Sequence, residues 1–548
     1  MSASSKKKLR NEQNAAKLTE RQLNEQKEAK KLKTYTTIFV VVLAAILVFA
    51  GYAGVTKYIS ANGVMEKKTV AATVGQHEIS NAEMNYYFID QVNNFYNQYG
   101  SYISLFGLDL TKPLNEQVVD EEKGTTWADD FMNSALQSAQ STYALVDAAK
   151  AAGHTLTEAE QKSIDSTLSN MKAYALMYGY GDTTTYLKAM YGKGASEESF
   201  RSYYENNLLA SSYHNTYSKG LTYDSAALEA AYNENPAEYH AFSYDSYYLN
   251  AVNYREGGTK DENGNVTYSD EEKAAAVEAA EADAQAIVAS GAKTNKDLNL
   301  AINALAINAD AENDVAATVC VDYAYASVNS VVRDWVTSSD RKAGDLTFIP
   351  STSTSTDAEG NETTVTNGYY VILFNGVNDN TFALKNVRHI LVSFEGGTYD
   401  SNTQTTTYSD EEKAAAKSKA EEILASWQAG DATEESFAAL ANEKSADGDG
   451  TTGGLYEDIY PGQMVTNFND WCYDAARQPG DTGIVESPYG YHVMYFVADS
   501  ETNYRDFQVA NHLRSHDTET WYNSLIEAAP LTELDTKYIA KNLVLSNG

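Results

Sequence analysis

The ten residues TYSDEEKAAA occur twice in this chain, at Thr267–Ala276 and at Thr407–Ala416. Each copy follows an EGGT sequence and a polar loop, and each precedes an alanine-rich amphipathic stretch. Both regions later contain a DW pair, a GD turn and a GY-x-V segment in the same order. Self-similarity of this kind predicts two domains built on one scaffold, which constrains the fold more than any other feature of the sequence.

The two copies differ in the polar residues of their predicted strands. The second copy has His389 and His492, whereas the first has Asn250 or a neighbour, and Tyr370, in the matching places. The repeated string itself marks a helix start, because each copy has a serine followed three residues later by a glutamate, the pattern of a capping box. We therefore expect a shared scaffold, with catalysis in the second domain and binding in the first.

The N-terminal 34 residues are basic, although the chain as a whole is acidic. They carry ten Lys and Arg against four Glu, while the complete chain has a formal net charge of −35. No charged residue lies between Lys33 and Lys57, and this apolar stretch is long enough to cross a bilayer as a helix. We predict a transmembrane helix over 35–56 in a single-pass cell-membrane protein, with the tail 1–34 in the cytoplasm and the bulk of the chain outside.

A cleaved signal peptide is the alternative for this segment, although the apolar run is longer than the core of a typical signal sequence. No cysteine follows the span, which argues against a lipid anchor. The two cysteines, Cys320 and Cys472, occupy non-matching positions of the repeats, so we interpret them as single core thiols and exclude a disulfide framework.

The acidic composition also limits the partners of the chain. Nucleic acids bind to basic patches, so we expect no nucleic-acid partner. Nothing in the sequence resembles a zinc site, and we expect no metal and no cofactor. An acidic exterior outside the membrane suits solubility and contact with unfolded or basic chains.

The remaining chain divides by periodicity. Residues 66–240 are mostly helical after a short strand and turn at Thr69–Ser80, and 501–548 are again helical. We expect this C-terminal segment to pack on the 66–240 domain. The predicted fold class is α+β: a mostly helical domain, followed by repeat domains at 241–380 and 385–500 that combine strands with covering helices.

Residues 385–500 resemble the parvulin family of peptidyl-prolyl isomerases. The motifs that carry the resemblance stand in the family's order: RHILV at 388–392, FAALA at 437–441 with Ser445, GGL at 453–455, GQM at 462–464 with Phe468, PGD at 479–481 and YGYHV at 489–493. The resemblance implies an antiparallel sheet flanked by helices and catalysed rotation of X–Pro bonds. That reaction crosses a barrier of roughly 18–20 kcal/mol without making or breaking a covalent bond, so it needs neither nucleophile nor metal.

The resemblance further implies which residues form the site. Leu455, Met464 and Phe468 would form the apolar pocket for the proline ring, and His389 and His492 a buried imidazole pair. From the residues alone, we would favour ordinary core packing for the first three. The histidines could orient a hydrogen-bond network without transferring protons.

Three further residues complete the predicted site. Asp447 stands where the family keeps a Cys or Asp beside the substrate carbonyl, although its Gly/Asp-rich loop leaves a simple turn former as the alternative. Ser487 and Tyr489 stand where hydroxyl groups support the second histidine. Tyr489 is bulkier than the usual serine or threonine, but it still supplies a hydroxyl.

The other domains are interpreted by the same resemblance. Residues 241–380 lack both histidines, the GQM…F run and the GG-x-L turn, and Val332 falls opposite Phe468, as expected for a degenerate, non-catalytic parvulin-like domain. Residues 66–240 with the C-terminal helices resemble the chaperone part of SurA- and PrsA-type foldases.

We therefore expect a membrane-anchored extracytoplasmic foldase that binds unfolded or newly translocated polypeptides and isomerises their X–Pro bonds. One alternative is a catalytically inactive holdase whose parvulin domains are both vestigial. Another is a surface adhesion protein that uses parvulin folds as spacers. A homodimer, in which a second chain completes a crevice between helical arms, is also left open.

Overall fold

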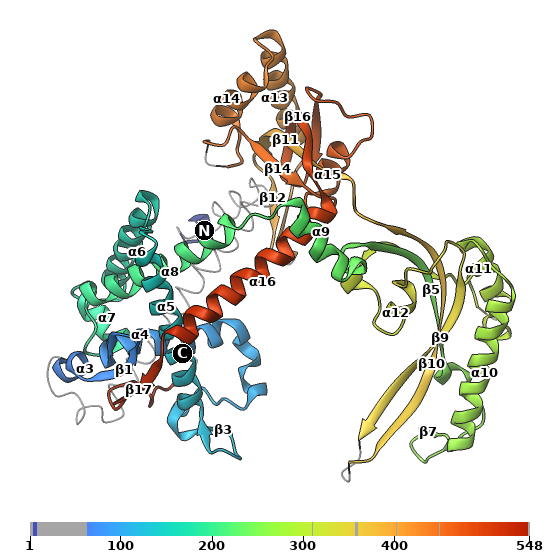
Figure 1. The fold of residues 1–548 in the computed structure, drawn as a ribbon, viewed down its shortest axis with the longest axis horizontal. Coiled ribbons are helices and arrows are strands. Elements are labelled where there is room, and N and C mark those ends of the chain that lie inside the picture. Colours follow the sequence, from blue (N-terminus) through green and yellow to red (C-terminus); the bar gives the residue numbers. More distant parts are fainter. Residues whose placement is uncertain are drawn as a thin grey trace.

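The computed structural model describes residues 4–7, 63–309, 311–356, 360–401, 403–448 and 450–545. Figure 1 shows a helical lobe, two lobes that each combine a sheet with helices, and a long C-terminal helix that joins the helical lobe to the second sheet lobe. The transmembrane helix predicted for 35–56 lies outside the described residues. Within the described ranges, no helix combines the length and the apolar character needed to cross a membrane.

The helical lobe begins with a small hairpin and continues with helices that have defined starts. Its main elements are α3 (Val64–Lys68), β1 (Val70–Val74), β2 (His77–Ser80), α4 (Asn81–Tyr99), β3 (Val118–Asp120), β4 (Thr125–Thr126), α5 (Trp127–Ala151), α6 (Glu158–Met177), α7 (Thr183–Tyr191), α8 (Glu197–Gly220) and α9 (Ser225–Glu234). Thr126, Thr157 and Ser196 each accept a backbone N–H in a capping box. Tyr86 and Tyr87 are almost fully buried, so the aromatic stripe of α4 forms core.

The C-terminal helix α16 (Tyr504–Ala528) packs on this helical lobe. The ring of Trp521 stacks on Tyr217 of α8 with centroids 3.7 Å apart, and the Tyr522 hydroxyl donates to Ser141 Oγ of α5 at 2.6 Å. The helix ends at Ala528 and does not continue over 529–545 as expected, because Pro530 has no N–H to donate and cannot extend it; residues 546–548 lie outside the described residues. The chain instead forms strand β17 (Leu531–Glu533), which pairs antiparallel with β1.

Two buried asparagines fasten this returning segment to the start of α4. The Asn81 side chain donates to the Asp535 carbonyl at 2.7 Å, and the Asn85 side chain donates to the Tyr538 carbonyl at 3.2 Å. Both asparagines are buried, so these bonds satisfy side-chain donors that would otherwise be costly. The helical lobe is therefore completed by residues from the opposite end of the sequence.

The two sheet lobes share one topology. The first contains β5 (Ala241–Asn250), β6 (Thr259–Lys260), β7 (Val266–Thr267), α10 (Asp270–Ala289), α11 (Asn295–Asn303), β8 (Thr318–Ala324), α12 (Arg333–Val336), β9 (Leu346–Thr356) and β10 (Glu362–Asn378). The second contains β11 (Ala383–Ser393), β12 (Thr398–Asp400), β13 (Thr405–Thr407), α13 (Asp410–Ala429), α14 (Glu434–Lys444), β14 (Leu455–Ile459), α15 (Thr466–Cys472), β15 (Thr482–Ser487) and β16 (Gly490–Asn503). The antiparallel sheets run β8-β5-β10-β9 and β14-β11-β16-β15. In both sheets, the four strands of the lobe, numbered along the chain, lie in the order second, first, fourth, third.

The repeated decapeptide has a structural role in both lobes. Ser269 and Ser409 cap α10 and α13, and each capping box is closed by the glutamate three residues on. The other carboxylate oxygen of that glutamate accepts the N–H of a glycine in the preceding EGGT, at 2.9 Å for Glu272 and 2.8 Å for Glu412. The string and the EGGT sequence therefore recur together because one side chain joins the loop to the helix start.

The later parts of the repeats also correspond residue by residue. Arg341 lies over the Trp335 ring and 3.7 Å from Asp345, and Arg477 lies over the Trp471 ring and 3.7 Å from Asp481. Residues 319–345 and 455–481 therefore align without a gap. A difference follows at the β9–β10 hairpin, which extends as a two-stranded ribbon in Figure 1 and whose sequence from Ser351 to Asn367 is polar.

Candidate active site

The candidate site lies on one face of the second sheet. His389 of β11 and His492 of β16 come from the two central strands and are 2% and 4% exposed. Side chains alternate along a strand, so His389 shares its face with Val387, and α15 packs there. Helices α13 and α14 cover the opposite face. The sheet thus holds both imidazoles between the strands and α15, away from bulk water.

The polar side chains on this face form one continuous hydrogen-bonded chain. The two imidazole Nδ1 atoms are 3.1 Å apart, His389 Nε2 lies 3.0 Å from Asp447 Oδ2, and His492 Nε2 lies 2.8 Å from Ser487 Oγ. With Asp447 ionised and both imidazoles neutral, a single arrangement of protons satisfies every link. Ser487 O–H donates to His492, His492 Nδ1–H donates to His389, and His389 Nε2–H donates to Asp447.

The protonation of His492 agrees with this arrangement. Burial lowers the pKa of His492 to about 3, and the neighbouring His389 acts in the same direction, while Asp447 opposes the shift. His492 is therefore neutral at physiological pH, with one nitrogen donating and the other accepting. His492 can therefore keep its place in the hydrogen-bonded chain without taking up a proton.

Asp447 is held by more than its contact with His389. The Tyr456 hydroxyl donates to the same carboxylate oxygen at 2.6 Å. The loop itself is fixed to β11, because Ser445 Oγ accepts the Leu391 N–H at 3.0 Å and the Asp447 N–H at 3.1 Å. Asp447 is thus part of the hydrogen-bonded chain and has more contacts than a simple turn former.

An apolar wall stands against the imidazoles. The Phe468 ring of α15 meets both edge-on, with its centroid 5.4 Å from that of His389 and 5.3 Å from that of His492. Met464 and Tyr456 pack in the same cluster, and the Tyr456 ring lies 4.7 Å from that of His389. This combination of an apolar wall with fixed polar groups suits a proline ring next to a carbonyl group.

The prediction that Leu455 lines this pocket is wrong by one residue. Leu455 pairs with Arg388 and Tyr456 pairs with Val387 across the β11–β14 ladder. Consecutive strand residues face opposite sides of a sheet, so Tyr456 points to the histidine face and Leu455 to the other. The GG-x-L motif located the strand correctly, but strand alternation was needed to choose the residue.

The two predicted supporting residues contribute in different ways. The Ser487 hydroxyl contacts His492 directly, as expected, whereas Tyr489 donates its backbone N–H to Ser487 Oγ at 3.1 Å. Gly490 follows with a φ of 147°, and a Cβ atom there would collide with the Val392 carbonyl. The GYH sequence thus lets β16 approach β11 closely enough for the imidazoles to meet.

The corresponding face of the first sheet lacks this chain of polar groups. Gly368 pairs with Asn250 as Gly490 pairs with Ser393, so the register assigns Ser246 and Tyr370 to the positions of the two histidines. The expectation for Tyr370 is confirmed, but Asn250 is not the matching residue. The side chains that replace Tyr456, Met464 and Phe468 are all buried and belong to one cluster: Cys320, Val328 and Val332.

Comparison with known proteins agrees with this geometry. Residues 371–499 match the PPIC-type peptidyl-prolyl isomerase domain, and residues 27–214 match the SurA-like N-terminal domain. The chain thus contains a PPIC-type, or parvulin, domain and a SurA-like N-terminal domain. Its parvulin domain is the one that carries the histidine pair, and its helical lobe lies largely within the SurA-like match.

Individual relatives match shorter stretches. Foldase protein PrsA 1 of Listeria innocua is 40% identical over 68 residues, and its counterpart in Listeria monocytogenes is 38% identical over the same length. These matches cover 12% of this chain and 23% of each relative, so the aligned part spans less than a quarter of their length.

Two solved structures of peptidylprolyl isomerase (PrsA) also match. The structure from Bacillus anthracis is 21% identical with a TM-score of 0.17 and covers 27% of this chain and 59% of that chain. The structure from Bacillus cereus is 22% identical with a TM-score of 0.16 and covers 30% and 57%.

Proposed function

We propose that this protein is a membrane-anchored extracytoplasmic foldase. Its 385–500 domain isomerises X–Pro bonds, and its helical and first sheet lobes hold unfolded polypeptides during that reaction. The observation that carries the proposal is the hydrogen-bonded chain from Ser487 through both histidines to Asp447, set against the Phe468 wall.

The chemistry of rotation explains why such a site is suitable. The planar amide is stabilised by charge separation, which water favours, so a dry apolar site weakens that stabilisation. Phe468, Met464 and Tyr456 offer an apolar wall for the proline ring. The two histidines and Asp447 are already fixed by mutual hydrogen bonds, so they need little reorganisation while the amide twists.

The isomerase activity is tested with the full chain and a short proline peptide whose cis/trans relaxation is followed spectroscopically. We expect acceleration by the wild-type chain and its loss in Met464→Ala combined with Phe468→Ala. The matched control is Val328→Ala combined with Val332→Ala, which makes the corresponding truncations in the first sheet lobe. Absence of acceleration by the wild type, or full activity of the Met464/Phe468 variant, would contradict the proposal.

Holding of unfolded chains is tested separately by suppression of aggregation of a denatured client protein. We expect the Met464/Phe468 double variant to retain most of this protection, because the proposal assigns holding to the other lobes. If the wild type suppresses aggregation but accelerates no proline peptide, the inactive holdase becomes the better description. If it does neither, both functions are excluded.

The anchor and the orientation form the last part of the proposal. The basic tail and the uncharged stretch after Lys33 support a single span with the N-terminus in the cytoplasm. The test is protease treatment of intact cells whose outer layers have been removed. An epitope at the N-terminus should be protected while residues 63–545 are degraded, and the reverse pattern would contradict the orientation.

A further inference from the structure

In the second sheet lobe, the side of β11 that faces away from β16 is covered even beyond the end of β14. There the Leu391 N–H donates to Ser445 Oγ at 3.0 Å, and the Leu391 carbonyl accepts the Ala446 N–H at 2.9 Å. The loop after α14 therefore acts as a short additional strand beside β11, where β14 does not reach.

The first sheet lobe leaves the equivalent edge uncovered by such bonds. Tyr248 pairs with Tyr370 as Leu391 pairs with His492, so Tyr248 takes the place of Leu391. The Leu249 carbonyl faces Gly368 of β10, and alternate residues of a strand point their N–H and C=O groups in opposite directions. The Tyr248 N–H and C=O groups consequently point away from β10. Pairing of β5 with β8 ends at the pair Ser246 and Thr318. Among the described residues, no loop segment forms backbone hydrogen bonds with Tyr248 in the way that the loop after α14 does with Leu391.

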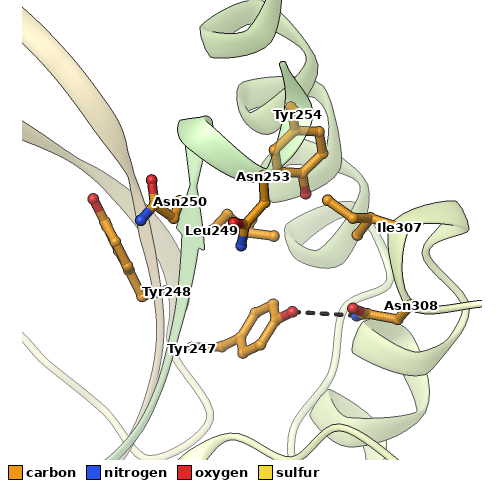
Figure 2. Close-up of a pocket in the computed structure, with 8 residues that line it drawn as sticks. All are labelled: Tyr247, Tyr248, Leu249, Asn250, Asn253, Tyr254, Ile307 and Asn308. Atoms are coloured by element: carbon orange, nitrogen blue, oxygen red, sulfur yellow. Dashed lines mark hydrogen bonds between the residues drawn. The ribbon is translucent and has the colours of Figure 1, made fainter. Parts of the chain in front are cut away.

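A pocket of about 310 Å³ lies along this edge (Figure 2). The rings of Tyr247 and Tyr254 and the side chain of Ile307 face it from three different segments. Both phenol groups are held in place: Tyr247 Oη accepts from the Asn308 side chain at 3.2 Å, and the Tyr254 hydroxyl donates to Asp283 at 2.8 Å. The pocket is thus formed by side chains that are already oriented, which reduces the entropy lost on binding.

We propose that this edge of β5, from Tyr247 to Asn250, binds an extended segment of an unfolded polypeptide as an added strand. The Tyr248 N–H donates to a carbonyl of the peptide, and the Tyr248 carbonyl accepts a peptide N–H. An aromatic side chain of the peptide enters the pocket between the rings of Tyr247 and Tyr254. This inference rests on the proposed holding function and gives it a site and a ligand class.

The features of the edge favour a peptide over other occupants. A peptide backbone supplies one donor and one acceptor at the spacing of a strand, and these are the partners that the Tyr248 C=O and N–H groups lack. In the other lobe, the Ala446 N–H and the Ser445 hydroxyl supply them to Leu391. Tyrosine rings bind other aromatic rings in edge-on or offset contacts. The amides of Asn253 and Asn308 at the pocket can meet the hydroxyl of a tyrosine.

The experiment measures the fluorescence anisotropy of a labelled, proline-free peptide of alternating threonines with one central phenylalanine, titrated with the full chain. A first comparison replaces the central phenylalanine by alanine. A second uses a peptide N-methylated at residues flanking the phenylalanine, which removes strand donors but keeps the side chain. On the protein side, Ile307→Asp places a charge in the pocket at a residue that is 37% exposed and so tolerates the change. Val365→Asp on the exposed β9–β10 ribbon is the matched control.

We expect the alanine peptide, the N-methylated peptide and the Ile307→Asp variant each to weaken binding by about tenfold or more, with the Val365→Asp variant unchanged. Equal affinity for the N-methylated and the unmodified peptide would overturn strand addition. This comparison uses the wild-type protein, so a folding defect of a variant cannot explain its result. Unchanged binding by Ile307→Asp would remove the pocket from the interaction. Isomerase activity of the same preparations on a proline peptide reports the proposed enzymatic function independently.

Discussion

The Tyr456 hydroxyl donates to Asp447 Oδ2 at 2.6 Å, and this is the oxygen that also receives His389 Nε2. One carboxylate oxygen therefore joins the apolar wall of the site to its imidazole pair. In the first sheet lobe, the residue in the place of Tyr456 is Cys320, and no histidine is present on that face. The tyrosine thus occurs in the lobe that needs the aspartate to be held in position.

The first prediction concerns this hydroxyl. Tyr456→Phe keeps the ring against His389 and removes one donor from a buried carboxylate, which costs about 1 to 3 kcal/mol. We expect a lower urea midpoint for the parvulin domain and a fall of about tenfold in kcat/KM for a proline peptide, the rate equivalent of 1.4 kcal/mol. The control is Tyr495→Phe, because the Tyr495 ring packs on the opposite face of the sheet. Equal losses in both variants would remove any specific role of the Tyr456 hydroxyl.

The second prediction concerns pH. Because burial lowers the pKa of His492 to about 3, the unfolded chain takes up a proton near the ordinary histidine value of about 6.5 that the folded chain does not accept. Stability is therefore fully present above that value and falls as the pH decreases toward 3, by about 2 kcal/mol between pH 7 and pH 5 from this group. Urea unfolding at both pH values should show a smaller decrease in a His492→Gln variant. An identical decrease in that variant would contradict the assignment to His492.

The same shift predicts a flat activity profile. His492 stays neutral in the folded protein from pH 8 down to pH 5, so its hydrogen bonds to His389 and Ser487 do not change over this range. We expect kcat/KM for a proline peptide to vary less than about twofold between these limits. A bell-shaped profile centred near pH 6.5 would instead indicate that an imidazole titrates during catalysis.

The third prediction concerns Asp245 of β5. This residue is fully buried, and neither of its carboxylate oxygens has a hydrogen-bond partner in the described structure. An unpaired buried polar group destabilises the folded state, so Asp245→Val should raise the free energy of unfolding by about 1 to 3 kcal/mol. Thermal unfolding of the variant provides the measurement, and Asp340→Val, at an exposed carboxylate of the same lobe, is the control. A lower melting temperature for Asp245→Val would show that the carboxylate is stabilised in the native protein.

The fourth prediction concerns Cys472 of α15. Burial raises the pKa of this thiol to about 12, so its thiolate fraction at pH 8 is on the order of one in ten thousand. Mass spectrometry after iodoacetamide treatment should detect no modification of Cys472 in the native protein and complete modification in urea. Phe468→Ala removes a ring from the same cluster and should accelerate labelling. Rapid labelling of the native wild type would contradict the burial of this helix.

The sequence was sufficient to identify residues whose position follows from a motif. His389 and His492 each lie in a short motif within one strand, and Ser487 ends β15 just before the turn into β16, so local spacing determines where each side chain points. Leu455 was a wrong choice for the pocket because a motif names a segment and does not state which face its residues occupy.

Features that depend on contacts between distant parts of the chain could not be predicted from local motifs. The match of Ser246 to His389 depends on the pairing of β5 with β10, which are separated by more than a hundred residues of chain. Strand β17 is three residues long, and it is stabilised by a partner near the start of the sequence, so no local pattern marks it. The pocket beside Tyr248 likewise combines the end of β5 and the turn after it with residues 307–308, which lie more than fifty residues further along the chain.

The attachment of Asp535 and Tyr538 to Asn81 and Asn85 has a consequence for protein synthesis. The helical lobe is translated first, but β1 finds its second neighbour only after β17 has left the ribosome. At roughly 5 to 20 residues per second, this delay is on the order of a minute. Both sheet lobes have all their strands earlier, so the part of the chain that is made first is the last that can finish folding.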